Sequence, residues 1–397
     1  MKFSKTTNII IPFFLIVCLF NTNNRADENQ NEKILRGVWV STVSNIDFPS
    51  KRGLSAEEMK NEADFMLDII QSLGLNAVFL QVRPMGDAFY PSKIYPWSAF
   101  LSGKQGEAPD QQFDALAYWV EGAHQRGIQI HAWINPYRVT SGKITLDKLA
   151  INNPARLHPE WTFEHDGKIY LNPGLPEVRE LVVSGIAEIV QNYNVDGIHI
   201  DDYFYPARKM TQDEETFRQY GGDFNNIEDW RRNNVDLLIQ MIHQTIHQIN
   251  PNVVWGVSPA GIWANQPDHP LGSQTRGNQT YFNLFADSRS WVKNEWVDYI
   301  IPQIYWHIGF KIADFKTLVD WWADVAEGTS TKLYIGMAIY RVNSKSKTPE
   351  WQTADEIKRQ LDYIRTKKQV RGTVFFTMND LKPGTPVYEM LIKFPFK

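Results

Sequence analysis

The sequence contains a single cysteine, Cys18, so the chain forms no internal disulfide and has no thiol nucleophile in its main body. It also lacks a surplus of charge of either sign: 41 Lys and Arg against 45 Asp and Glu give a formal net charge of -4. This balance gives no reason to expect a nucleic-acid partner and fits a neutral or weakly charged substrate. The sequence has no G-x-G-x-x-G or P-loop for a nucleotide phosphate and no G-x-S-x-G for a serine nucleophile.

The apolar run at residues 9–20 is too short to cross a bilayer comfortably. Two lysines precede it, so residues 1–20 are predicted to be a signal peptide or lipoprotein signal. Cys18 is a candidate for lipidation, although Val17 is larger than such sites prefer, and ordinary cleavage or an uncleaved anchor are the alternatives. Residues 21–34 are polar and are predicted to be a tether. We therefore expect a protein of the cell envelope that is periplasmic, lipid-anchored or secreted.

From residue 35 onward, short β-rich apolar runs alternate with amphipathic stretches. The predicted strands are residues 36–42, 76–83, 129–136, 196–202, 253–259, 299–306, 333–340 and 372–378. The clearest helical periodicity lies at residues 56–74, 113–127, 176–193 and 235–249.

Eight strands that alternate with helices predict an α/β fold, a single (β/α)8 TIM barrel over residues 35–397. An open doubly wound sheet is the alternative, but such a sheet usually carries the glycine-rich phosphate turn that this chain lacks. Residues 137–175 and 260–285 follow the third and fifth strands and are predicted to be extended loops that wall a cleft.

Polar residues gather at the C-terminal ends of the predicted strands, where barrel enzymes place their active sites. Residues two apart on a strand point the same way, so pairs such as Gln81 and Arg83 are predicted to share the face at the barrel mouth. For His131 and His199 a second interpretation, as hydrogen-bonded core histidines, stays open. The predicted substrate-binding residues are Arg83, His131, Trp133, Asn135, Tyr137, His199, Tyr203, Trp263, Gln303, Tyr305, Trp306 and Arg341.

The stretch GIHIDDYFYP at residues 197–206 ends an apolar strand in two adjacent carboxylates, Asp201 and Asp202. Taking a carboxylate out of water is costly, and a strand end is not a capping position, so function explains this pair better than structure. Turn-like contexts surround three other aspartates, and there a structural role is favoured. These are Asp47, Asp380 and Asp87, of which Asp87 is kept as a third catalytic candidate.

Two carboxylates are what glycoside hydrolysis requires, one to protonate the leaving oxygen and one to stabilise the oxocarbenium charge. Adjacent residues approach one sugar together only if the chain turns after Asp201. That arrangement suits substrate-assisted hydrolysis, in which the 2-acetamido group is the nucleophile, one carboxylate orients its nitrogen and the other is the general acid. In the alternative, Asp201 is the nucleophile and Asp87 supplies the acid.

Two further hypotheses compete with a glycosidase. A metal-dependent hydrolase or deacetylase would bind its ion through His199, Asp201 and Asp202 together with His131, His307 or Asp87. Their spacing matches no standard zinc signature, so neither a metal nor another cofactor is expected. A glycan-binding scaffold without turnover is the third hypothesis, because no glutamate closely follows a strand end.

Seven stretches resemble the glycosyl hydrolase-like 10 family of bacterial envelope proteins: RGVWVST, FLQVRPMGDAFYPS, IHAWINPYRV, YLNPGLPEVRE, VDGIHIDDYFYP, WGVSPAGIW and DYIIPQIYW. This family includes a divisome-localised glycosyl hydrolase that cleaves peptide-free, or denuded, peptidoglycan glycan strands. The resemblance implies an exported or lipid-anchored hydrolase of the N-acetylglucosamine and N-acetylmuramic acid polymer, with Asp201 in the position of the catalytic aspartate of related barrel hydrolases. Some members continue into a C-terminal β-domain, which we expect this chain to lack.

Denuded strands expose lactyl carboxylates, which suit bidentate binding by arginine. Arg83, Arg138 and Arg341 are the arginines expected to meet them. Aromatic side chains also stack on sugar faces. The residues expected to do so are Trp39, Trp133, Trp263, Trp306, Tyr203 and Tyr205, with a core position as the equal alternative for Trp39.

Overall fold

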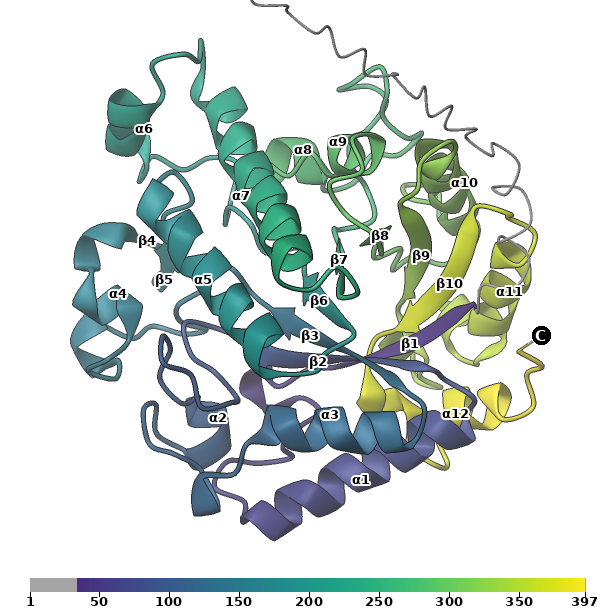
Figure 1. Cartoon of the computed structure of the whole chain (residues 1–397). Coiled ribbons are helices and arrows are strands. Elements are labelled where there is room, and N and C mark those ends of the chain that lie inside the picture. Colours follow the sequence, from purple (N-terminus) through teal and green to yellow (C-terminus); the bar gives the residue numbers. More distant parts are fainter. Residues whose placement is uncertain (1–33, 397) are drawn as a thin grey trace, which may run out of the picture. The chain divides into compact units, whose positions relative to one another are not determined.

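The computed structural model describes residues 34–396, so the predicted signal segment, Cys18 and nearly all of the tether lie outside the described residues. Eight parallel strands close into a barrel in the order β1-β10-β9-β8-β7-β6-β3-β2. In Figure 1 the first strand lies beside the last, and their backbone pairing completes the ring. The predicted (β/α)8 barrel is confirmed.

The barrel strands lie close to their predicted positions. They are β1 Leu35–Val40, β2 Ala77–Arg83, β3 Gln129–Ile134, β6 Gly197–Ile200, β7 Val254–Val257, β8 Tyr299–Ile300, β9 Lys332–Met337 and β10 Val370–Phe375. Most end earlier than predicted because their last residues turn into the loops at the barrel mouth. Strand β8 is the shortest, since Pro302 has no N–H for the ladder.

Helices surround the barrel (Figure 1). They are α1 Ala56–Ser72, α2 Ala99–Ser102, α3 Ala115–Gln125, α4 Pro154–Leu157, α5 Pro176–Asn192, α6 Glu214–Tyr220, α7 Ile227–Ile249, α8 Thr280–Asn283, α9 Ser288–Lys293, α10 Phe315–Ala326, α11 Asp355–Ile364 and α12 Pro386–Leu391. None of the described helices is both long enough and apolar enough to span a membrane.

Local sequence explains where the long helices begin. The Ser55 hydroxyl accepts a hydrogen bond from the Glu58 backbone N–H, and the Glu58 carboxylate accepts one from the Ser55 backbone, so a capping box starts α1. Helix α7 begins at residue 227, earlier than the predicted 235, because Asn226 caps it. In its first turns the charged residue Arg231 occupies a buried position, so this segment lacks the regular apolar spacing by which a helix is predicted.

The two predicted loops carry structure of their own. Residues 137–175 contain a hairpin of β4 Thr162–His165 and β5 Lys168–Leu171. Asp166 and Gly167, both with positive φ, form its two-residue turn. Residues 260–285 contain α8 and a bridge between Asn265 and Ser273.

Two apolar layers position the site. The larger core lies between the strands and the helices. A smaller cluster contains residues of six barrel strands, among them Trp39, Phe79, Trp133, Tyr299 and Tyr334. In a parallel (β/α)8 barrel, layers of inward-facing side chains fill the interior, so ligands bind at its mouth.

Candidate active site

A pocket opens at the C-terminal ends of the barrel strands. Its lining combines two carboxylates with polar side chains and an aromatic wall. The lining residues are Trp39, Ser41, Val43, Ile46, Gln81, Trp133, Arg138, Asp201, Asp202, Tyr203, Ser258, Gln303, Tyr305 and Phe376. Four of the predicted binding residues, namely Trp133, Tyr203, Gln303 and Tyr305, and both adjacent aspartates therefore meet in one place.

Asp201 is the first residue after β6, and its buried carboxylate is held by three donors. The indole N–H of Trp133 donates to Oδ2 at 3.1 Å, and the amide of Asn135 donates to Oδ1 at 3.1 Å. The backbone N–H of Tyr203 adds a longer bond of 3.4 Å. Burial raises the pKa of Asp201, while the Arg138 charge and these donors oppose the rise.

Asp202 lies beside it in a different environment. The chain turns after Asp201, which is the condition for two adjacent carboxyls to face one sugar. The half-buried Asp202 carboxyl therefore lines the same pocket. Burial and then the neighbouring Asp201 charge raise the pKa of Asp202 to about 7, against a hydrogen bond from the Gln303 side chain. The Asp202 carboxyl therefore holds a proton at a higher pH than an ordinary aspartate does.

Arg138 and Tyr203 form one rim of this pocket. The Arg138 guanidinium donates to the Pro84 carbonyl at 2.9 and 3.1 Å and lies 4.7 Å from the centre of the Tyr203 ring. Tyr203 is 51% exposed. An exposed ring against a fixed cation forms a surface on which a sugar can stack.

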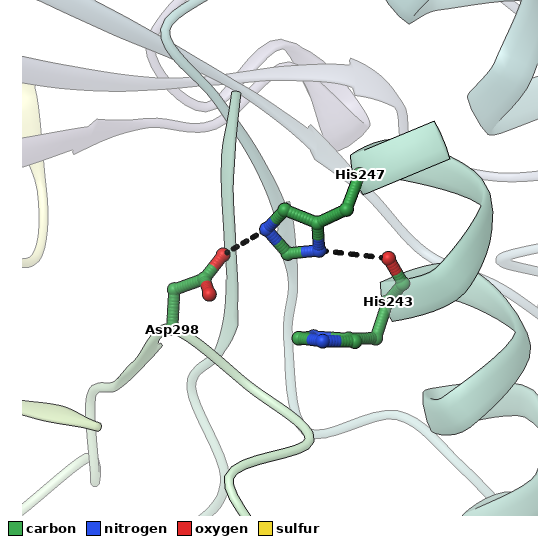
Figure 2. Close-up of side chains that lie close together, drawn as sticks. All are labelled: His243, His247 and Asp298. Carbon is green, nitrogen blue, oxygen red and sulfur yellow. Dashed lines mark hydrogen bonds and ion pairs between the residues drawn. The ribbon is translucent and has the colours of Figure 1, made fainter. Parts of the chain in front are cut away.

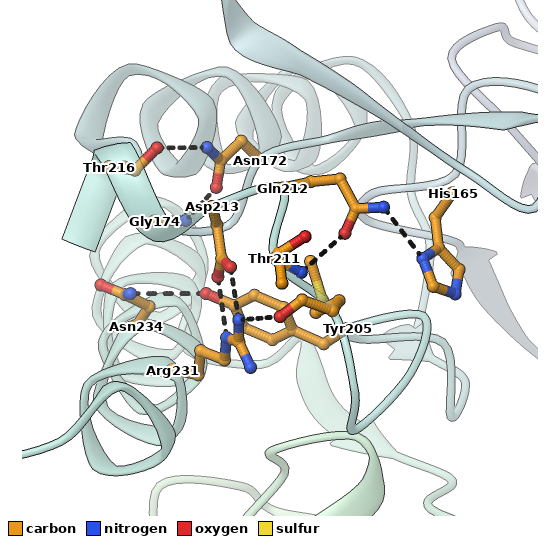
Figure 3. A network of polar contacts seen from close by, with 11 residues as sticks. His165, Asn172, Gly174, Tyr205, Thr211, Gln212, Asp213, Thr216, Arg231 and Asn234 are labelled. Carbon is orange, nitrogen blue, oxygen red and sulfur yellow. Dashed lines mark hydrogen bonds and ion pairs between the residues drawn. The ribbon is translucent and has the colours of Figure 1, made fainter.

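The loop after β6 is fastened to α7 by a buried ion pair (Figure 3). Arg231 donates to both carboxylate oxygens of Asp213, at 2.8 and 2.5 Å, and to the Met210 carbonyl at 2.9 Å. Nearby, Asn234 donates to the hydroxyl of buried Tyr205 at 3.4 Å. These contacts fix the segment that begins with Asp201 and Asp202.

The two barrel histidines are core residues and do not line the pocket. The Nε2 atom of His199 lies 2.9 Å from the Ser258 hydroxyl and accepts from the Trp39 indole at 3.2 Å. His131 Nδ1 lies 3.0 Å from the Tyr299 hydroxyl. Burial lowers the pKa of His131 to about 4 and that of His199 well below its usual value, so both are neutral. The prediction that they bind substrate is therefore corrected: both lie in the layer of side chains below the pocket.

The prediction that Arg83 faces the barrel mouth is also corrected. The register of β2 against β3 shifts between Gln81 and Arg83, so these two side chains do not share a face. Gln81 lines the pocket, and its Oε1 accepts from the backbone N–H of Val43 at 2.9 Å. Arg83 is buried, and its guanidinium lies 4.0 Å from the centre of the Tyr95 ring.

Asp87, the third catalytic candidate, lies outside the pocket lining. It is fully buried and accepts hydrogen bonds from Gln105, at 3.3 Å, and from Ser98. Burial raises its pKa to about 6. Asp47 and Asp380 have the structural roles favoured for them: Asp47 accepts from Thr377 at 2.9 Å, and Asp380 forms a capping box with the same threonine.

The other predicted binding residues also lie outside the lining. Asn135 donates a hydrogen bond to Asp201, and Tyr137 is buried. Trp263 is buried, donates to Asp287 at 2.9 Å and stacks on Trp321. Trp306 is half-buried and Arg341 is exposed. Arg341 packs over Tyr340, whose ring contacts the pocket residue Tyr305.

Three lining residues escaped prediction although they share a position with Asp201. Ser41, Ser258 and Phe376 are each the first residue after a barrel strand, namely β1, β7 and β10. A hydroxyl that finds a hydrogen-bond partner and an aromatic ring are both common in protein interiors, so neither residue type marks a strand end as a site. The strand boundary itself would have identified all three.

The alternative metal site is not assembled. Within residues 34–396, the one group of His, Cys, Asp or Glu side chains close enough to share an ion is His243, His247 and Asp298. None of these three lines the pocket. The histidines proposed to join Asp201 and Asp202 in binding metal are not grouped with them.

A parallel barrel with a carboxylate-containing, aromatic-walled pocket at its strand ends has the architecture of a glycoside hydrolase. The chain belongs to the Glycosyl hydrolase-like 10 family, which it matches over residues 34–353. It is 43% identical to glycosyl hydrolase YngK of Bacillus subtilis over 94% of this chain and 73% of YngK. It is 42% identical to glycosyl hydrolase DigH of Escherichia coli K12 over 91% of this chain and 87% of DigH.

Among solved structures, the glycoside hydrolase domain of PgaB (BpsB) from Bordetella bronchiseptica matches with a TM-score of 0.57 at 12% identity. The match covers 90% of this chain and 98% of that domain. At this identity the likeness concerns the fold. The family relationship, in contrast, makes this protein a glycoside hydrolase and confirms the resemblance found in the sequence.

Proposed function

We propose that this glycoside hydrolase cleaves peptide-free peptidoglycan glycan strands, or a similar amino-sugar polymer, with Asp201 and Asp202 as its catalytic pair. The observation that carries the proposal is that two adjacent carboxyls line one pocket in different environments. Asp201 accepts three hydrogen bonds, whereas Asp202 is half-buried and has a pKa raised to about 7. Two carboxyls in such different environments can take different roles in one reaction.

Asp202 is the general acid in this proposal, and Asp201 positions the substrate. A carboxylate has about four acceptor positions, so Asp201 keeps one for the N–H of a 2-acetamido group. The acetamido oxygen attacks the anomeric carbon while the Asp202 proton passes to the leaving oxygen and the glycosidic bond breaks. Water then opens the cyclic intermediate and returns a proton to Asp202. The alternative with Asp87 as acid is less favoured because Asp87 does not line the pocket.

The pocket walls suit an amino-sugar chain. Tyr203, Tyr305 and Phe376 are exposed enough to present rings to a sugar face, whereas Trp39 lines the pocket as a buried residue. Arg138 is the one arginine of the pocket and supplies the cation for the lactyl carboxylate of a denuded strand. A cell-envelope location, with attachment through Cys18 as one option, completes the proposal because this polymer lies in the envelope.

The experiment is digestion of denuded and of peptide-bearing glycan strands by the wild type, with Asp201→Asn as an inactive control and products resolved by mass. We expect cleavage of denuded strands by the wild type only, and the reducing-end sugar identifies the bond. Binding of both polymers without any cleavage would favour the glycan-binding scaffold instead. Equal cleavage of peptide-bearing strands would contradict the substrate proposal.

A further inference from the structure

Three potential metal ligands meet at the end of the barrel opposite the pocket. His243 and His247 lie on the last turns of α7, and Asp298 immediately precedes β8 (Figure 2). One ligand atom from each residue lies within 4.8 Å of the other two. Because Asp298 stands at the N-terminal end of its strand, this cluster is separate from the site of Asp201, which follows a C-terminal strand end.

The hydrogen bonding of His247 leaves one nitrogen available. Its Nδ1 lies 2.8 Å from the backbone carbonyl oxygen of His243, and a carbonyl only accepts, so Nδ1 carries the hydrogen. In neutral His247 the lone pair is then on Nε2, which lies 3.2 Å from Oδ2 of Asp298. That oxygen already accepts the Trp255 backbone N–H at 2.7 Å. Two acceptor atoms that face each other need a proton or a cation between them.

His243 is the third member, and the fold leaves it unexplained. Its Nδ1 is buried and has no hydrogen-bond partner among the described residues. Its ring centre lies 4.3 Å from that of His247. Residues four apart on a helix occupy one face, which is the spacing with which helical histidine pairs bind zinc.

A second histidine and aspartate pair in the same barrel shows what the fold alone requires. His124, at the end of α3, lies 2.9 Å from Asp196, which precedes β6. Oδ2 of Asp196 accepts the Ile130 backbone N–H at 2.8 Å, just as Asp298 accepts that of Trp255. Four residues before His124, however, stands Val120. One histidine paired with one aspartate is enough to connect the end of a helix to the start of a strand. His243 is therefore not needed for that connection.

We propose that His243, His247 and Asp298 form a binding site for a divalent transition-metal ion, with Zn²⁺ as the fitting occupant. Two imidazoles and one carboxylate suit zinc, and water would fill the fourth position. The His243 carbonyl and the Trp255 N–H already hold two of the ligands as outer-shell partners do. The ion would join the end of α7 to the start of β8 and stabilise the folded barrel by binding only that state.

The test uses the full-length protein after dialysis against a chelator has removed any bound metal. ZnCl₂ is titrated calorimetrically, Co²⁺ binding is followed by visible absorption, and the unfolding temperature is measured with and without Zn²⁺. We expect one equivalent of Zn²⁺, a higher unfolding temperature with Zn²⁺, and at least about 10-fold weaker binding in His243→Gln. The matched variant His124→Gln should bind Zn²⁺ like the wild type.

Three results would contradict the proposed metal site. Absence of stoichiometric Zn²⁺ uptake would do so, as would undiminished binding in His243→Gln or an equal loss in His124→Gln. The unfolding temperature of metal-free His243→Gln, expected to match that of the metal-free wild type, shows that the variant is folded. Glycan cleavage is not the readout, so the result stands independently of the proposed substrate.

Discussion

At the scale of single residues, environment distinguishes two aspartates that sequence alone treats as equal. Trp133 and Asn135 donate to Asp201, whereas Asp202 lies next to the charge of Asp201 and to Gln303. Sequence reasoning found the pair because a charged strand end is costly to bury. It misplaced Arg83, because a one-residue register shift in β2 leaves no mark on the local pattern of residues.

The proposed role of Asp202 as general acid predicts how activity depends on pH. A general acid must be protonated, and the pKa of Asp202 is raised to about 7, so kcat/KM should fall as pH rises through about 7. The measurement is the pH profile of kcat/KM on a soluble glycan fragment. An alkaline limb that lies in the same place in Asp202→Asn would contradict this assignment.

At the scale of elements, the close approach of β2 to α5 depends on a glycine. A Cβ on Gly185 would lie 2.3 Å from an Arg83 guanidinium nitrogen and 2.6 Å from the Tyr95 ring. We expect Gly185→Ala to lower the free energy of unfolding by about 1–3 kcal/mol through overpacking, measured by urea denaturation. Gly222→Ala is the control, since nothing lies within 4 Å of a Cβ there, and an equal effect of both would refute the explanation.

The buried ion pair under the loop after β6 gives a second prediction at this scale. Arg231→Met leaves the Asp213 carboxylate buried without its partner, so unfolding free energy should fall by about 3–5 kcal/mol. The exposed pair of Arg218 and Glu215 is a matched control, and Arg218→Met should cost less than about 1 kcal/mol. Denaturant titration of both variants measures the difference, and similar losses would contradict a special role for the buried pair.

At the scale of the whole molecule, eight alternations of strand and helix were enough to predict the barrel. The two predicted loops were found as lengths only, because hairpin β4–β5 and helix α8 take their positions from tertiary contacts. Helix α7 shows the same limit, since its first turns are stabilised by Asn226 and by buried Arg231 instead of an apolar stripe. Position along the barrel axis, not residue type, separates the catalytic candidates from the core histidines.

The most direct test of the carboxylate pair compares leaving groups. For wild type, Asp201→Asn and Asp202→Asn, kcat/KM is measured on amino-sugar glycosides with either a sugar or a dinitrophenyl leaving group, and Asp87→Asn is the control. A general acid contributes about 10²–10⁴-fold, and a dinitrophenolate leaves without protonation. Asp202→Asn should therefore lose activity on the sugar leaving group and keep most of it on the aryl glycoside, while Asp201→Asn loses both. Equal losses of Asp202→Asn on the two substrates, or full activity in both variants, would contradict the account.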